Sequence, residues 1–156
     1  MPTIERAVEV SVPASVAYNQ WTQFEQFPRF MEDVEEVKQI DDRRLHWRAK
    51  LAGKIEEWDA EITEQIPDKR IAWRATDGAP NAGVVTFHRI DDDHSRVMVQ
   101  MDYEPHGIVE NAGSLLGIFG KRVERDLQQF REFIERRGAA TGAWRGEVTA
   151  KDDRGH

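Results

Sequence analysis

Several polar residues with metal-binding side chains lie close together near the middle of the chain. Asp102, Glu104 and His106 alternate along it, and Glu110 follows His106 by one helical turn. Carboxylate and imidazole groups at this spacing could approach one another. A metal site needs several such groups converging on one point, and the sequence marks no further partner for them. We therefore predict no metal site.

Other short motifs fall short of known catalytic patterns. The acidic run 91–93 before His94 lacks the spacing of a calcium loop and is typical of a hairpin tip. Ser114 follows Gly113 without the later glycine of a nucleophile elbow. Gly120-Lys121 is followed by arginine, not by the Ser or Thr of a phosphate-binding loop. The chain has no cysteine for thiol catalysis, and we predict no cofactor.

Two residues remain as tentative catalytic candidates, Glu56 and Tyr103. Glu56 points to the same face of its strand as Trp58, Tyr103 lies on an apolar face, and Asn81 at a loop edge is a further polar candidate. A carboxyl buried among aromatic rings has its ionised form disfavoured and could serve as an acid or base. The alternative is that Glu56, at the start of its strand, lies at the wet rim of the sheet.

Four stretches that could position these residues alternate apolar and polar side chains. They run over 44–51, 57–63, 70–75 and 97–103, and they place Trp47, Trp58 and Trp73 at apolar positions. Side chains of a strand point alternately to its two faces, so the pattern predicts an antiparallel sheet with one aromatic face. What covers that face decides the function.

Three further strands and three helices complete the predicted fold. The strands are 4–12, 83–90 and 34–40, the last with the broken alternation of a bulged strand. After Pro13 come two short helices, one with Ala17, Trp21 and Phe24 at helical spacing and one over 27–31. From about Gly107 to Arg137 an apolar stripe predicts a long helix with one buried face. We predict an α+β fold, a seven-stranded curved antiparallel sheet wrapped around this helix.

The order of these elements resembles the helix-grip layout of the START-like superfamily. At residue level the chain looks like the polyketide cyclase/dehydrase group, which also contains the coenzyme Q-binding START-like proteins. The segments that carry the resemblance are Val10–Tyr18, Trp21–Phe24, Phe27–Met31, Trp58–Ile62, Gly83–Phe87 and the closing helix. The resemblance spans 3–137 and implies a cavity between helix and sheet, which the superfamily uses for lipids, quinones, polyketides and hormones. One fold hosts many functions, so it indicates the activity only weakly.

Length and composition limit the classes of protein. The 156 residues suit one domain, which we place at 1–137, followed by a polar tail over 138–156 that Trp144 could pin back. The sequence has no apolar run long enough to span a bilayer and no signal-peptide layout, so we expect a cytoplasmic protein. A net charge of -7 argues against nucleic acid as a partner.

The leading hypothesis is a noncatalytic binding or carrier protein for a small hydrophobic ligand such as a lipid, a quinone or a polyketide. Its motivation is a continuous aromatic face without a catalytic constellation. The same rings could instead fill the core, but large rings under a strongly curved sheet favour a pocket. The proposed lining residues are Trp47, Trp58, Trp73, Phe87, Met101, Tyr103, Leu116 and Phe119.

Two alternatives and one surface contact stay open. The resemblance implies a cyclase/dehydrase-type enzyme that uses the same cavity, with Glu56 and Tyr103 as its acid or base. Another branch of the superfamily acts on ribosomes and implies an interaction module, against which the acidic balance argues. Ile118, with Lys121 and Arg122 beside it, could make transient contact with an anionic membrane surface.

Overall fold

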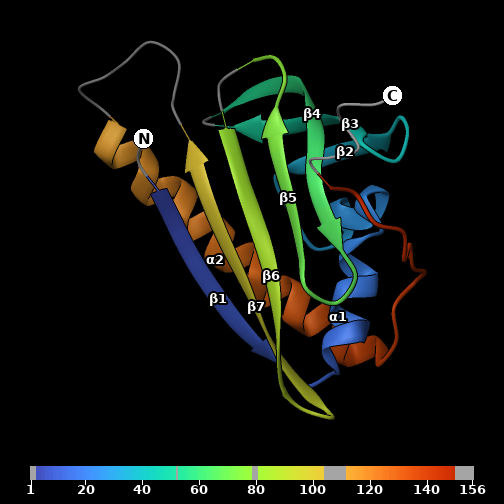
Figure 1. The fold of residues 1–156 in the computed structure, drawn as a ribbon. Coiled ribbons are helices and arrows are strands. Elements are labelled where there is room, and N and C mark those ends of the chain that lie inside the picture. Colours follow the sequence, from blue (N-terminus) through green and yellow to red (C-terminus); the bar gives the residue numbers. More distant parts are fainter. Residues whose placement is uncertain (1–2, 52, 79–80, 104–111, 150–156) are drawn as a thin grey trace.

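The computed structural model describes residues 3–51, 53–78, 81–103 and 112–149 (Figure 1). Its secondary structure follows the predicted order, and the predicted α+β helix-grip fold is confirmed. The elements are β1 (Thr3–Val10), α1 (Ala14–Trp21), the 3-10 helix η1 (Phe24–Arg29), β2 (Val34–Gln39), β3 (Arg44–Leu51), β4 (Lys54–Ile66), β5 (Arg70–Ala75), β6 (Asn81–Asp91), β7 (His94–Tyr103) and α2 (Ala112–Arg137).

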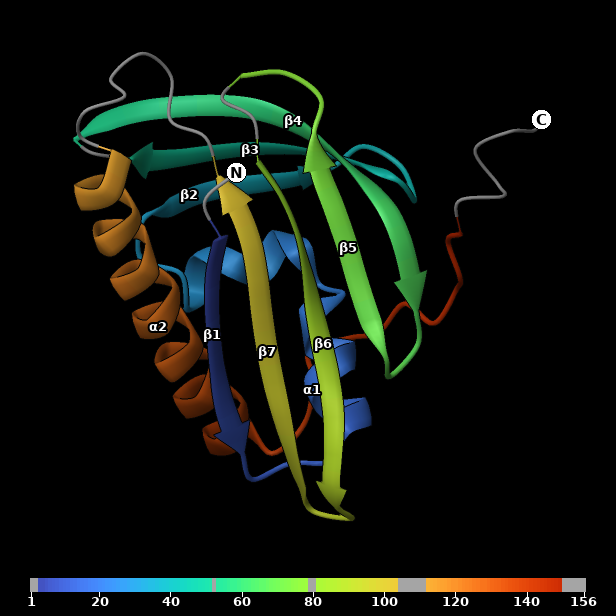
Figure 2. The same cartoon turned by 60° about the vertical axis from the view of Figure 1, so that its left-hand side comes forward.

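The seven strands form one antiparallel sheet in the order β1-β7-β6-β5-β4-β3-β2. Consecutive strands pair as hairpins from β2 to β7, and β1 closes the sheet by pairing with the last strand. The register shifts at Val34/Glu36, where the sequence predicts a bulge, and again at Ile62/Glu64. Bulges bend and twist a strand. The strands β2, β3 and β4 accordingly turn across β1, β7 and β6 (Figure 2).

Helix α2 lies along the concave side of this sheet and is tied to both ends of it. Glu124 forms an ion pair with Arg6 of β1 at 3.5 Å, and Arg125 forms one with Asp33, just before β2, at 2.9 Å. The two edge strands thus hold the helix between them (Figures 1 and 2). Exposed ion pairs add little stability, so their main effect is on the position of the helix.

The carboxy-terminal half of α2 packs on a solid aromatic core. Phe130 and Ile134 are fully buried, and the Phe130 ring lies 5.0 Å from that of Trp21 at the end of α1. Trp21 also contacts Phe27 of η1 edge to face, with ring centroids 5.5 Å apart. The two small helices therefore fill the space between sheet and helix at this end, and any cavity must lie beneath the other half of α2.

After α2 the described chain folds back over α1 and the end of β4. Val148 is buried and pairs with Gln65 through two backbone hydrogen bonds, at 2.8 and 2.9 Å. Arg145 forms a two-pronged ion pair with Asp68 at 2.8 and 2.9 Å. The backbone N–H of Trp144 donates to the Thr22 hydroxyl at 3.0 Å. Residues 138–149 thus pack against the domain.

Candidate ligand-binding cavity

A cavity of about 200 Å³ lies between the inner face of the sheet and the amino-terminal half of α2. Its walls come from the two small helices, from strands β2, β3, β4, β5 and β7, and from α2. Apolar side chains dominate it. The lining residues are Trp21, Phe24, Phe27, Met31, Asp33, Val34, Leu45, Trp47, Ala49, Trp58, Ile62, Ile71, Trp73, Val99, Met101, Phe119, Arg122, Val123, Asp126 and Leu127.

Three tryptophans on three neighbouring strands form one wall. Trp47 and Trp58 are directly paired between β3 and β4, and their rings stack with centroids 5.8 Å apart and planes 5° apart. Trp73 of β5 lies across from Gly83, and its indole N–H donates to the Asn81 side-chain oxygen at 3.3 Å. The tryptophans therefore both touch one another and border a space.

Five of the eight proposed lining residues border this cavity, namely Trp47, Trp58, Trp73, Met101 and Phe119. Phe87 does not: it is buried in the solid core, 5.3 Å from Tyr18 and 6.3 Å from Trp21 between ring centroids. The side chains of Tyr103 and Leu116 lie outside the described part of the chain. Phe87 points to the same face of the sheet as the cavity residues, but at its position along the sheet the side chains of α1 fill the region between sheet and helix.

Glu56 does not enter the cavity. It lies near the start of β4 opposite Ala49, and its side chain is exposed, as the wet-rim alternative has it. Glu104, His106 and Glu110 lie outside the described residues. Within the described ranges, no group of three His, Asp or Glu side chains converges as a metal site would require.

The cavity nevertheless contains ionisable groups, all at one end. Asp33, Arg122 and Asp126 are its charged lining residues. The Arg122 Nε lies 3.2 Å from Asp33 Oδ2, and Arg125 reaches the same oxygen from outside the cavity at 2.9 Å. Arg122 also donates to the backbone carbonyl of Lys50 at 3.4 Å. These contacts join α2 to both β2 and β3 at the charged end.

Asp126 is less closely paired than Asp33. Its Oδ1 is buried without a hydrogen bond among the described residues, and the nearest cation, the Arg125 guanidinium, is 3.9 Å away. Burial raises the pKa of Asp126 to about 7, although the charges of Arg125 and Arg122 oppose the shift. A carboxyl that titrates near neutrality beside an apolar space can give or accept a proton.

The sequence analysis missed Asp126 and placed Arg122 on the outer side of the helix. Both follow Phe119 at helical spacing, by seven and three residues, so they share its face at the edge of the apolar stripe. A carboxylate among the phenylalanine, valine and leucine residues of this face was the available signal. A prediction of the buried helix face that considers only apolar residues does not include a charged residue such as Asp126.

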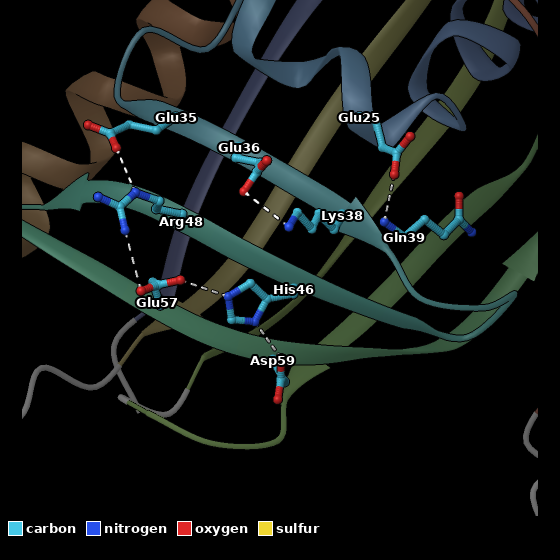
Figure 3. A network of polar contacts seen from close by, with 9 residues as sticks. All are labelled: Glu25, Glu35, Glu36, Lys38, Gln39, His46, Arg48, Glu57 and Asp59. Carbon is cyan, nitrogen blue, oxygen red and sulfur yellow. Dashed lines mark hydrogen bonds and ion pairs between the residues drawn. The ribbon is translucent and has the colours of Figure 1, made fainter.

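The outer face of β2, β3 and β4 carries charged groups that neutralise one another (Figure 3). His46 lies between Asp59 and Glu57, at 2.7 and 3.0 Å, and Arg48 bridges Glu35 and Glu57 at 2.9 and 3.4 Å. Hydrogen bonds that the ring donates to the Glu57 and Asp59 carboxylates raise the pKa of His46. Opposite charges paired in this way across neighbouring strands stabilise the polar face of the sheet modestly.

The three residues predicted to touch a membrane are not equivalent. Ile118 is 47% exposed, and Lys121 is exposed, whereas the Arg122 side chain is only 24% exposed and paired with Asp33. In the described part of the chain, no helix has the length and apolar character to cross a membrane.

The curved sheet covered by one long helix, with a lined space between them, is the helix-grip fold of START-like proteins. A START superfamily protein from Mycobacterium smegmatis has this fold, with a TM-score of 0.72 and 12% identity over 85% of this chain and 98% of that one. So does the Zhui aromatase/cyclase from a Streptomyces species, with a TM-score of 0.73 and 16% identity over 92% and 99%. At such identities the likeness shows the fold alone.

Sequence comparison identifies the family. The family described as polyketide cyclase/dehydrase and lipid transport matches residues 10–132, and the chain belongs to this family. An uncharacterised 17.2 kDa protein of Streptomyces lincolnensis is 52% identical over 149 residues, which cover 95% of this chain and 99% of that protein. That alignment is longer than the predicted domain of 1–137, so the relative shares part of the segment that follows α2.

Proposed function

We propose that this protein binds a small hydrophobic ligand in the cavity between α2 and the sheet, as a carrier or binding protein. The observation that carries the proposal is the space itself, which is lined by Trp47, Trp58, Trp73 and Phe119 and left open beneath one half of the helix. A concave, mostly apolar space of this kind is the usual form of a small-molecule site. Expulsion of water from apolar surface would supply most of the affinity.

The experiment combines a search for the natural ligand with a matched pair of variants. Native mass spectrometry after gentle purification looks for a bound lipid, quinone or polyketide, and N-phenyl-1-naphthylamine serves as a neutral apolar probe. Ala49→Phe places a ring in the cavity, whereas Ala72→Phe adds the same ring to the opposite face of β5, between the inward-facing Ile71 and Trp73. We expect the first variant to abolish probe binding and the second to retain it. Absence of both ligand and probe binding, or equal binding by the two folded variants, would refute the proposal.

A second candidate function is catalysis of the cyclase/dehydrase type in the same cavity, and Asp126 is the observation that favours it. With Glu56 exposed, Asp126 is the lining residue best suited to proton transfer, because burial raises its pKa to about 7. In the dehydration of a β-hydroxy ketone, the α C–H and β C–O bonds break as a C=C bond forms. Protonated Asp126 would give its proton to the leaving hydroxyl, and the resulting carboxylate would take up the α proton, so that water leaves and the acid is restored. Loss of water from an aromatic β-hydroxy ketone, followed by mass spectrometry, tests this. Activity that is absent, or that Asp126→Ala leaves unchanged, would exclude the role.

The surface beside the cavity belongs to the same proposal. Ile118 and Lys121 are exposed on α2, one turn or less from Phe119 and Arg122 of the cavity wall. An apolar and a basic side chain at this place would suit brief contact with an anionic membrane during exchange of a lipid. Co-sedimentation of Ile118→Ser and Lys121→Gln with phosphatidylglycerol vesicles measures this. Binding equal to that of the unmodified protein would dismiss it.

A further inference from the structure

At the charged end of the cavity, the ion pairs of the two arginines can be assigned without the Asp126 carboxyl. The two arginines there are matched by two acids: Asp33 contacts both guanidinium groups, at 3.2 and 2.9 Å, and Glu32 lies 3.6 Å from Arg125. Asp126 is the fifth ionisable group and has no hydrogen bond to its buried Oδ1 among the described residues. The cluster is therefore already neutral when Asp126 holds a proton.

A ligand made only of hydrocarbon would leave this group in a poor environment. It would exclude water from the cavity and keep the buried Asp126 oxygen without a hydrogen bond, which is unfavourable for a desolvated polar atom. A ligand anion would meet an uncompensated carboxyl, because Asp33 already engages Arg122. A ligand cation would have to lose its hydration beside Arg122 in a cavity whose other walls are apolar. A neutral oxygen avoids all three difficulties.

We propose that protonated Asp126 donates a hydrogen bond to a neutral oxygen, a carbonyl or a hydroxyl, at one end of an otherwise apolar ligand. This inference rests on the proposed function, since it needs a ligand in the cavity. The rings of Trp47 and Trp58 and the side chain of Phe119 then hold the apolar body, and Asp126 sets its orientation. The ligand class is thus a flat or branched hydrocarbon skeleton with one neutral polar end.

The hydrogen bond makes ligand affinity depend on pH. Burial already raises the pKa of Asp126 to about 7, and an apolar ligand that excludes more water raises it further. The charged groups that act on it are Glu32 and Asp33, from the turn before β2, and Arg122 and Arg125, from its own helix. Binding therefore takes up a proton, and affinity falls as the pH rises through 7.

Four naphthalene probes of similar shape test the chemistry directly. They are 2-acetylnaphthalene with a neutral carbonyl, 2-isopropenylnaphthalene with no oxygen, 2-naphthoate as the anion and 1-(2-naphthyl)ethylamine as the cation. Calorimetry at pH 6 and pH 8.5 measures their affinities. We expect the acetyl compound to bind about tenfold more tightly than the isopropenyl compound at pH 6, since one hydrogen bond is worth roughly 1.4 kcal/mol. Most of this preference should vanish at pH 8.5.

Three variants assign the effect to Asp126. Asp126→Asn keeps a neutral donor, so its preference for the acetyl compound should persist at both pH values. Asp126→Leu removes the donor and should bind the two neutral probes equally at both pH values. Glu124→Gln, an exposed acid on the same helix paired with Arg6, is the control and should behave like the unmodified protein.

The possible results separate the two proposals. A preference for the acetyl compound that survives in Asp126→Leu, or tightest binding of the anion or the cation at pH 6, would overturn the inference while leaving the cavity as a ligand site. Equal affinity of the unmodified protein for both neutral probes at pH 6 would also overturn the hydrogen-bond inference and leave the cavity as a ligand site. Failure of every probe to bind would refute both.

Discussion

Trp47 and Trp58 stack in parallel across the β3–β4 pair, with ring centroids 5.8 Å apart, and both rings border the cavity. Each indole packs against the other, and both also contact the space of the cavity. The stack gives the cavity a flat, rigid wall, and this suits a ligand with a planar or extended skeleton.

A double-mutant cycle measures how strongly the two rings are coupled. Trp47→Leu and Trp58→Leu should each lower the free energy of unfolding, and their effects should not add. We expect an interaction energy of about 0.5–1.5 kcal/mol from urea unfolding of the two single variants and the double variant. Trp47→Leu combined with Trp144→Leu, which lies on the segment after α2, is the control pair and should be additive. Additivity within the stacked pair would contradict the direct contact.

Gly83 leaves room for the ring of Trp73. A Cβ at this position would lie 2.7 Å from the Trp73 ring and 2.7 Å from the backbone oxygen of Gln100, closer than real Cβ atoms approach. Gly83→Ala should therefore push Trp73 toward the cavity and cost roughly 1–3 kcal/mol of stability, as overpacking does. Probe affinity should fall with it. Gly117→Ala, with nothing within 4 Å of the added atom, is the control. Unchanged stability and probe binding in Gly83→Ala would contradict the close contact.

Asp126 should make the stability of the unliganded protein fall as the pH rises. Its pKa rises from 3.8 to about 7 on folding, so between these values the folded protein holds a proton that the unfolded chain releases. The penalty is complete above pH 7 and absent below about pH 4. Asp126→Asn should thus be more stable than the unmodified protein at pH 8, by on the order of 2 kcal/mol, with no difference near pH 3.5. Urea unfolding at several pH values measures this, and a difference that does not vary with pH would contradict the burial of Asp126.

His46 should stabilise the outer face in the opposite pH range. Hydrogen bonds to Glu57 and Asp59 raise its pKa above 6.5 in the folded protein, so its stabilising effect is full below pH 6.5 and is lost as the pH rises through the folded value. The side chain is 31% exposed and its partners are more exposed still, so the effect should be only a few tenths of a kcal/mol. A titration of the His46 ring by NMR should give a pKa above 6.5 in the unmodified protein and a lower one in Glu57→Gln. A normal value in both would contradict the arrangement in Figure 3.

The segment after α2 should contribute to the stability of the domain. A chain that ends at residue 143 loses the buried Val148 and the pairing of Arg145 with Asp68. We expect its unfolding free energy to fall by about 2–4 kcal/mol, since burial of a valine alone is worth roughly 1.5–3 kcal/mol. A chain that ends at Thr149 keeps the contacts of this segment and is the control. Equal thermal and urea stability of the two chains would show that the segment is dispensable.

Strand faces and the helix stripe could be predicted because they depend on short periods in the sequence. Alternation placed Trp47, Trp58 and Trp73 on one face, and all three lie there. The same alternation could not separate Phe87 from them, because parity identifies a face and not a position along the sheet. The side chain of Glu56 has the parity of Trp58 but lies at the exposed start of β4.

The sequence by itself determined the fold, the aromatic face and the long helix that covers it, since each follows from local patterns of apolar residues. Only the tertiary structure decided that the covered face contains both a solid core and a cavity. The position of the helix over the sheet depends on contacts between residues far apart in the chain, such as Arg125 with Asp33 and Phe130 with Trp21. The same long-range packing buries one carboxylate oxygen of Asp126 beside the cavity and leaves it without a hydrogen bond among the described residues.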